Sequence, residues 1–208
     1  MPQHGLMSRL PTVLGTDDLP LAELCAARID GELVAIDDGW APVDEPDLPS
    51  FRAAVVALRV PRALIIERRS AAWVHGALDV PPAVAQFCVP HDERVAVISD
   101  HRTQVREVTL GEGDVDDYLG VRCTSAVRTV FDLLRDATST DEEAISIVAR
   151  FVAERPDLIE EVDMRLDASR RMPHRALAVE RLGGAIARAA ASSASADGNL
   201  LAQPSLTR

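Results

Sequence analysis

The stretch GVRCTSAVRTVFDL, residues 120–133, contains the clearest local structural signals in the chain. Val121–Thr124 predicts a short strand, and Ser125–Asp136 predicts a helix with its apolar residues on one face. Thr124 and Ser125 are typical helix-start residues, because their hydroxyls can satisfy unpaired amide groups. Arg128 and Asp132 are four residues apart and can pair along the helix. The stretch therefore either stabilises the fold or contacts a partner.

A second motif, RSAAWVHG at residues 69–76, predicts a short helix around Trp73. Ser70 opens or caps this helix, which begins at about Arg62 or Arg69, and Gly76 ends it. His75 is interpreted as a packed helix-end residue, with a catalytic role as the alternative. Between the two motifs we expect strands at 84–90, 93–99 and 104–110 and a turn at 114–118.

The N-terminal part predicts a helix followed by a β-hairpin. The helix spans about Leu19–Ile29 and ends at Gly31, and two strands follow, Glu32–Ile36 and Trp40–Val43. Helix, glycine and hairpin in this order are the second half of a winged helix-turn-helix. We therefore interpret residues 1–45 as a degenerate winged helix, joined by a proline-rich, acidic linker to a helix at about 50–58.

The remainder predicts an α+β protein with a helical C-terminal part. Residues 50–136 form a mixed α/β core with a small sheet, 137–188 a helical extension, and 189–208 a disordered tail. Thr140 and Glu143 fit a capping box at the start of the extension. Further helices are predicted at Leu158–Leu166 and Ala176–Ala187.

The charge distribution is uneven. The net charge is −11, and residues 1–60 alone carry ten acids against four arginines. Residues 165–188 have the opposite sign, with six arginines against two acids. This segment is either a partner-binding or nucleic-acid-binding surface or a solvated helix face, as is the smaller pair Arg68 and Arg69. Its candidate binding residues are Arg165, Arg170, Arg171, Arg175 and Arg181.

Composition narrows the class of protein. All 22 basic residues are Arg, a bias associated with high-GC bacterial genomes. No stretch is long and apolar enough for a membrane helix. Three scattered cysteines argue against a disulfide framework and for a cytoplasmic protein. Phosphate-loop and nucleophile-elbow motifs are missing, so we expect no enzyme, no cofactor and no metal.

Residues 69–76 and 120–133, in this order, resemble the two signatures of the abortive-infection type IV toxin–antitoxin system antitoxin family. DGELVAIDDGWAPV at residues 30–43 is similar to the wing of that family. The resemblance covers roughly residues 19–136. It implies an antitoxin or transcriptional regulator that binds operator DNA, and it implies a nucleotidyltransferase-like toxin as a partner.

One departure from the family concerns the wing. Ala35, Asp37 and Asp38 stand where the family commonly carries arginine. Acids there oppose contact with phosphates, so we expect weak DNA binding. An interaction scaffold that has lost DNA binding is the alternative. A hydrolase that uses Ser70, His75 and Asp132 is a third hypothesis.

Overall fold

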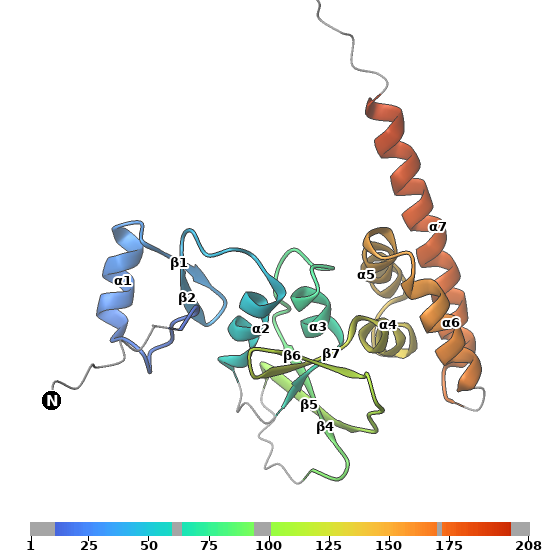
Figure 1. Ribbon diagram of the computed structural model, residues 1–208, viewed down its shortest axis with the longest axis horizontal. Coiled ribbons are helices and arrows are strands. Elements are labelled where there is room, and N and C mark those ends of the chain that lie inside the picture. The colour runs from blue at the N-terminus through green and yellow to red at the C-terminus, as the bar shows by residue number, and fades with distance from the viewer. Residues whose placement is uncertain (1–10, 60–63, 94–100, 170–171, 201–208) are drawn as a thin grey trace, which may run out of the picture.

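The N-terminal unit of the computed structural model is a helix followed by a two-stranded hairpin (Figure 1). The structure describes residues 11–59, 64–93, 101–169 and 172–200. Helix α1 (Leu21–Ile29) is followed by Gly31, whose φ of 78° ends it, and by β1 (Leu33–Ile36) and β2 (Gly39–Pro42). Ile36 pairs with Gly39, so Asp37 and Asp38 form a two-residue turn. The predicted order of helix, glycine and hairpin is confirmed.

The hairpin is held against the rest of the chain at its tip. The Asp37 carboxylate pairs with Arg59, and that of Asp38 lies 2.8 Å from Arg102 Nη2 and 3.3 Å from Arg59 Nε. Gly39 packs closely, because a Cβ there would lie 2.8 Å from a side-chain carbon of buried Val13. The hairpin, which is the predicted wing, is therefore fixed by ion pairs and close packing.

Within the described residues, the core sheet has five strands in the order β5-β4-β3-β7-β6. They are β3 (Ile65–Ile66), β4 (Ala85–Pro90), β5 (Thr103–Val108), β6 (Val115–Tyr118) and β7 (Val121–Thr124). The β4–β5 and β3–β7 pairs are parallel, and β3–β4 and β6–β7 are antiparallel. Helices α2 (Pro49–Ala57) and α3 (Arg68–Val74) pack with the sheet residues Ile66 and Phe87 in one apolar cluster.

Three of the predicted strands are confirmed, as β4, β5 and β7. The predicted turn at 114–118 is wrong, since residues 115–118 form β6 against β7. Its acidic sequence, VDDY, suits a sheet edge with exposed carboxylates, and it therefore lacks an apolar strand signal. The two-residue β3 was not predicted. The strand expected at 93–99 falls almost entirely outside the described residues.

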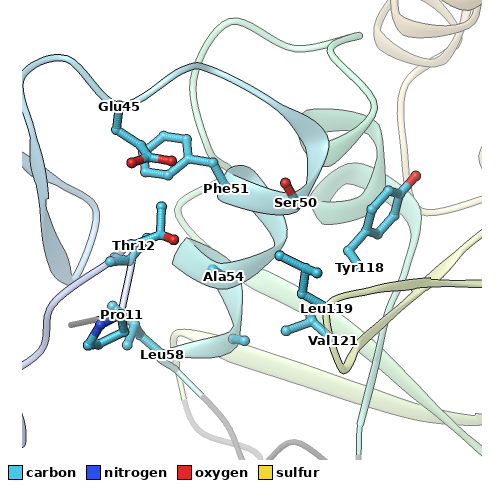
Figure 2. A pocket seen from close by; sticks show the side chains of 12 residues that line it. Pro11, Thr12, Glu45, Ser50, Phe51, Ala54, Leu58, Tyr118, Leu119 and Val121 are labelled. Carbon is cyan, nitrogen blue, oxygen red and sulfur yellow. The ribbon is translucent and has the colours of Figure 1, made fainter. Parts of the chain in front are cut away.

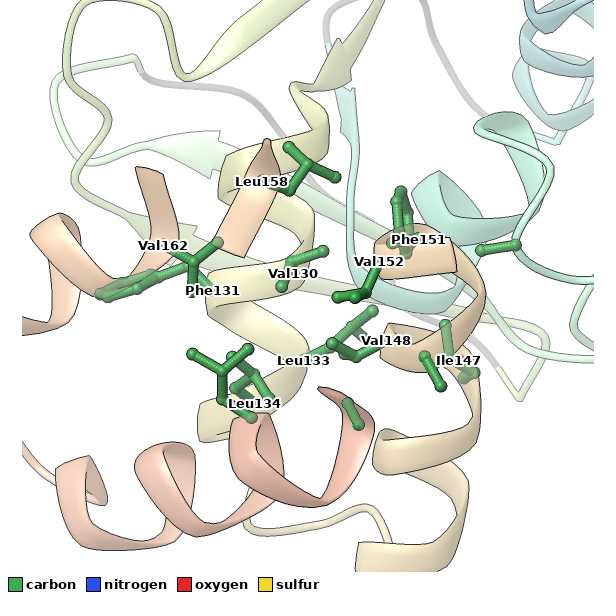
Figure 3. Packing of buried hydrophobic residues seen from close by; sticks show 14 of the residues in the cluster. Val130, Phe131, Leu133, Leu134, Ile147, Val148, Phe151, Val152, Leu158 and Val162 are labelled. Atoms are coloured by element: carbon green, nitrogen blue, oxygen red, sulfur yellow. The ribbon is translucent and has the colours of Figure 1, made fainter. Parts of the chain in front are cut away.

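The last four helices form the second half of the core (Figure 3). They are α4 (Ala126–Arg135), α5 (Asp141–Glu154), α6 (Leu158–Ala168) and α7 (Arg175–Leu200). Their shared cluster is built from aliphatic residues and Phe131 and Phe151. Thr140 caps α5 by accepting a hydrogen bond from the Glu143 amide, as predicted. The described residues contain seven helices and two sheets, so the protein is α+β, as expected.

Helix α7 is longer than predicted. Ala178, Leu182, Ala185 and Ala189 are buried at alternating spacings of four and three, which is the pattern of a helix seam. The sequence predicts the helix to end at Ala187 and a disordered tail from 189, whereas the helix continues to Leu200. Alanine is a strong helix former, which explains why the polar Ala/Ser segment remains helical here. Residues 201–208 lie outside the described part.

Gly39→Ala is expected to destabilise the protein by about 1–3 kcal/mol, because the added methyl group overpacks the contact with Val13. Gly183→Ala is the matched control, since its added Cβ would meet nothing described within 4 Å outside its own stretch of helix, and alanine favours a helix. Chemical denaturation gives both free energies of unfolding. Equal stability of Gly39→Ala and wild type would contradict the close packing of the wing.

Candidate functional site

The two sequence motifs lie against each other, because α3 and α4 pack together. The His75 side chain, at the end of α3, donates from Nε2 to the Thr124 carbonyl oxygen at 2.8 Å. Burial lowers the pKa of His75, so the imidazole is neutral. Its ring contacts those of Tyr118 and Phe151. His75 is therefore a packed residue that joins the motifs.

The first motif has mainly structural contacts. The Ser70 hydroxyl is fully buried and accepts a hydrogen bond from the Gln86 amide of β4 at 2.9 Å. The predicted cap at Ser70 is wrong, since Arg68 begins the helix and Ser70 joins it to the sheet. Trp73 is buried below the Arg52 guanidinium. Gly76 has a φ of 88° and ends the helix, as predicted.

The second motif forms the strand-to-helix junction of β7 and α4. Ser125 is the N-cap residue, and its hydroxyl accepts a hydrogen bond from the Arg128 amide. The Thr124 hydroxyl is instead bonded to that of Thr129 at 2.7 Å. Helix-start function is thus confirmed for Ser125, while Thr124 anchors the buried side of the junction.

A connected set of buried carboxylates and arginines lies where the sheet meets α4 and α6. We name it the charge network, and its members are Glu67, Arg68, Arg106, Asp114, Arg128, Asp132, Arg135, Asp136 and Arg165.

Asp132 is the centre of the charge network. Its Oδ2 accepts hydrogen bonds from Arg128 Nε and Arg106 Nη2, both at 2.8 Å. The predicted pairing of Arg128 with Asp132 is confirmed, and the pair is buried. Arg106 Nε also bonds both carboxylate oxygens of Glu67 at 2.7 Å. Burial alone lowers the pKa of Arg106, but the Glu67 hydrogen bonds and the charge of Asp132 raise it overall.

Asp114 connects the charge network to α6. Arg128 Nη1 donates to its Oδ2 at 2.7 Å, and Arg165 binds both of its oxygens. Burial raises the pKa of Asp114, but hydrogen bonds from Arg165, the Gly111 amide and Arg128 outweigh burial and lower it to about 2. Asp114 is therefore an ionised, fully used acceptor.

The other end of the charge network lies at the start of α3. Arg68 Nη1 lies 3.2 Å from an Asp136 carboxylate oxygen, and its Nε lies 3.7 Å from Glu67 Oε1. The φ of Arg68 is 45°, a left-handed conformation that costs a side-chain-bearing residue on the order of 1 kcal/mol. The surrounding ion pairs hold Arg68 in this conformation.

The charge network presents arginines to solvent and keeps its carboxylates inside. The carboxylate side chains are at most 3% exposed, whereas Arg106, Arg135 and Arg165 are 31%, 26% and 30% exposed. Five arginines face four carboxylates, so the network has one surplus positive charge. Its chemistry suits binding of an anion at the surface.

The prediction that the arginines of residues 165–188 form one basic surface is wrong. Arg181 is buried and donates to the carbonyl oxygens of Leu133, Leu134, Asp136 and Ser139, which closes the end of α4. Arg175 pairs with Asp167, and Arg188 with Glu142. Arg165 belongs to the charge network. Arg170 and Arg171 lie outside the described residues.

Of the smaller pair, Arg68 is in the charge network and Arg69 pairs with Glu143 at 2.7 Å. The three residues of the hydrolase hypothesis are separately engaged. Ser70 bonds Gln86, His75 bonds Thr124, and Asp132 bonds arginines. No group of three metal-ligating side chains occurs within the described ranges. No described helix is long and apolar enough to cross a membrane.

A second feature is a hollow between the N-terminal segment, α2 and the β6–β7 turn (Figure 2). Phe51 and Ala54 of α2 line one side of it, and Tyr118 and Leu119 line the other. Leu119 is 86% exposed. The lining is mixed, and it has no concentration of charge comparable to the charge network.

Sequence reasoning missed Glu67, Arg106 and Asp114 as members of the site. Arg106 stands in a predicted strand, where its register opposite buried Cys88 points it to a covered face. A charged residue on a covered face of a strand is rarely buried without a partner, so its position indicates a buried ion pair. Its partners could not be predicted, because they come from segments 39 and 26 residues away.

No protein-family model and no curated protein matches the chain. Among solved structures, the chain aligns with the RV2827C protein from Mycobacterium tuberculosis. The alignment has 16% sequence identity and a TM-score of 0.42, and it covers 84% of this chain and 72% of that chain.

Asp132→Ala is expected to destabilise the fold by about 3–5 kcal/mol, because it leaves buried Arg128 and partly exposed Arg106 without their shared carboxylate. Asp79→Ala removes an exposed partner of Arg150 and should cost under about 1 kcal/mol. Urea denaturation of both variants measures the difference. Similar losses for the two variants would show that the charge network contributes no more than a surface pair.

The stability that Asp114 contributes should be lost at acid pH. Its folded pKa of about 2 lies below the model-compound value of 3.8. Ionised Asp114 therefore stabilises the fold above pH of about 4, by on the order of 2 kcal/mol, and this is lost as the pH falls from about 4 to about 2. The free-energy difference between wild type and Asp114→Asn should shrink over that interval. A constant difference would contradict the assignment.

Proposed function

We propose that this protein is an antitoxin or transcriptional regulator of the type IV abortive-infection kind, which acts by binding and not by catalysis. The observation that carries the proposal is the contact between the two motifs that resemble the antitoxin family. They are separated by 43 residues, yet they meet through the His75–Thr124 hydrogen bond and through α3 and α4. Two signatures that form one structural unit support the resemblance better than two isolated matches.

The contacts of the motif residues support binding rather than catalysis. Ser70, His75 and Asp132 each bond to a different group, so they form no nucleophile–base pair in this structure. Beside the motif unit, the partly exposed side chains of Arg106, Arg135 and Arg165 pair with buried carboxylates. Operator DNA and a nucleotidyltransferase-like toxin are the partners that the resemblance suggests.

A second candidate is an interaction scaffold that has lost DNA binding, and the wing favours it. A wing tip contacts DNA phosphates, and here the tip carries Asp37 and Asp38. The Asp37 side chain is 9% exposed and pairs with Arg59, so the tip faces the protein body. Regulation through DNA requires that this tip become available.

Asp38→Asn discriminates between the two candidates. It removes one acid from the wing and weakens the ion pairs with Arg59 and Arg102, so a DNA-binding regulator should bind duplex more tightly. Fluorescence anisotropy with the duplex upstream of its own gene, and with a scrambled duplex, measures the change. Asp79→Asn is the control, since it makes the same charge change at an exposed site that pairs with α5.

The antitoxin activity is tested in cells by co-expression with a nucleotidyltransferase-like toxin encoded beside its gene. Growth should be restored by wild type and by Asp79→Asn. Absence of both growth rescue and sequence-dependent duplex binding would contradict the proposed function. Tight duplex binding by wild type at physiological salt would show that the acidic wing does not weaken DNA contact.

A further inference from the structure

We propose that Arg135, flanked by Arg106 and Arg165, forms a binding site for a terminal phosphate group, such as that of a phosphate monoester. The site lies on the exposed side of the charge network, at the end of α4. It goes beyond the proposed function, because neither antitoxin activity nor DNA binding requires it.

Arg135 lacks a close counterion. Its Nη1 lies 4.0 Å from Asp132 Oδ1, and Arg106 and Arg128 already bond Oδ2 of the same carboxylate. The Arg135 side chain is 26% exposed, and its Nη atoms donate no hydrogen bond within the described residues. An anion at the surface can therefore bind these Nη atoms and supply the missing acceptors.

The surroundings place other positive charges beside Arg135. The Arg135 and Arg165 guanidinium carbons lie 4.9 Å and 4.8 Å from the centre of the Phe131 ring. Burial lowers the pKa of Arg135, and the charges of Arg128, Arg106 and Arg165 lower it further against the opposing charge of Asp132. A bound anion would offset the repulsion between these positive charges.

The flanking arginines are positioned before any ligand binds. Arg106 uses Nε and Nη2 on Glu67 and Asp132, which leaves its Nη1 without a protein acceptor in the described residues. Arg165 donates from Nη1 and Nη2 to Asp114, which leaves its Nε as a donor for a ligand. Since these ion pairs hold both side chains in place, an anion orders little on binding, which favours affinity.

The donor set suits a terminal phosphate better than the other common anions. Guanidinium groups match phosphate oxygens in bidentate geometry. A carboxylate has two oxygens in one plane, so it can form a bidentate pair with one guanidinium group. A phosphodiester offers two free oxygens, whereas a terminal phosphate offers three and about two negative charges. Arg106 Nη1 and Arg165 Nε are single remaining donors, and Arg135 offers its two Nη atoms. Three separate guanidinium groups match the three free oxygens of a terminal phosphate better than the two of a diester.

The test is calorimetric titration at constant ionic strength with five probes. They are inorganic phosphate, adenosine monophosphate, adenosine, acetate, and an oligonucleotide that lacks terminal phosphates. Phosphate and the monophosphate should bind wild type, and adenosine should not. Arg135→Gln should weaken both by about ten-fold or more, as expected for losing a charge-assisted bidentate pair. Arg150→Gln, a surface arginine paired with Asp79, is the control and should bind like wild type.

Stability provides a second readout that separates a binding role from a structural one. The Arg135 side chain makes no hydrogen bond in the described chain, so in phosphate-free buffer Arg135→Gln should melt no lower than wild type. A lower melting temperature with unchanged phosphate binding would make Arg135 structural and overturn the proposal. It is also overturned if no phosphate binds, if acetate binds equally well, or if Arg135→Gln weakens binding of the oligonucleotide as much as binding of the monophosphate.

Discussion

The burial of the Asp132 carboxylate constrains the relative positions of the sheet and the helices. A buried carboxylate is tolerated only when its charge and its acceptor sites are satisfied. Arg128 comes from the same helix, but Arg106 comes from β5, so α4 must lie where both can reach it. Each arginine then needs further acceptors, which Glu67 and Asp114 provide. Arg165 binds Asp114 and fixes α6 by the same requirement. Burial of this one carboxylate thus requires a series of further ion pairs that connect the sheet, α4 and α6.

The parts of the fold that could be predicted are those set by neighbours in the sequence. The Arg128–Asp132 pair, the Ser125 cap and the wing hairpin each depend on residues within a few positions. Arg181 shows what local sequence cannot predict. Its neighbours are those of a basic, exposed helix, yet its side chain is buried and donates to four carbonyl oxygens at and after the end of α4. Local charge density does not specify whether an arginine meets solvent or a distant backbone. Strand β6 could not be predicted for a similar reason, because it is defined by its pairing with β7 and not by apolar residues of its own.

The net charge of −11 is a poor guide to what this surface attracts. Asp114 and Asp132 are counted in that sum, but each is almost completely buried. Three of their arginine partners, Arg106, Arg135 and Arg165, are partly exposed, so the charges of the network that meet solvent are positive. An acidic protein can therefore present a basic site, provided that its acids are placed behind its arginines. Screening by salt acts mainly on the exposed side and leaves the buried pairs little changed.

The wing shows the opposite arrangement, and the contrast bears on what the N-terminal unit can bind. Its tip acids pair with Arg59 and Arg102, so these arginines are occupied by the protein itself. Any phosphate that approaches the tip competes with Asp37 and Asp38 for the same guanidinium groups. Binding of DNA at the wing must therefore break intramolecular ion pairs, and that cost lowers the affinity. At the charge network no such competition arises for Arg135, because its nearest carboxylate is already shared by two other arginines. The same residue types thus neutralise one surface and leave the other able to accept an anion.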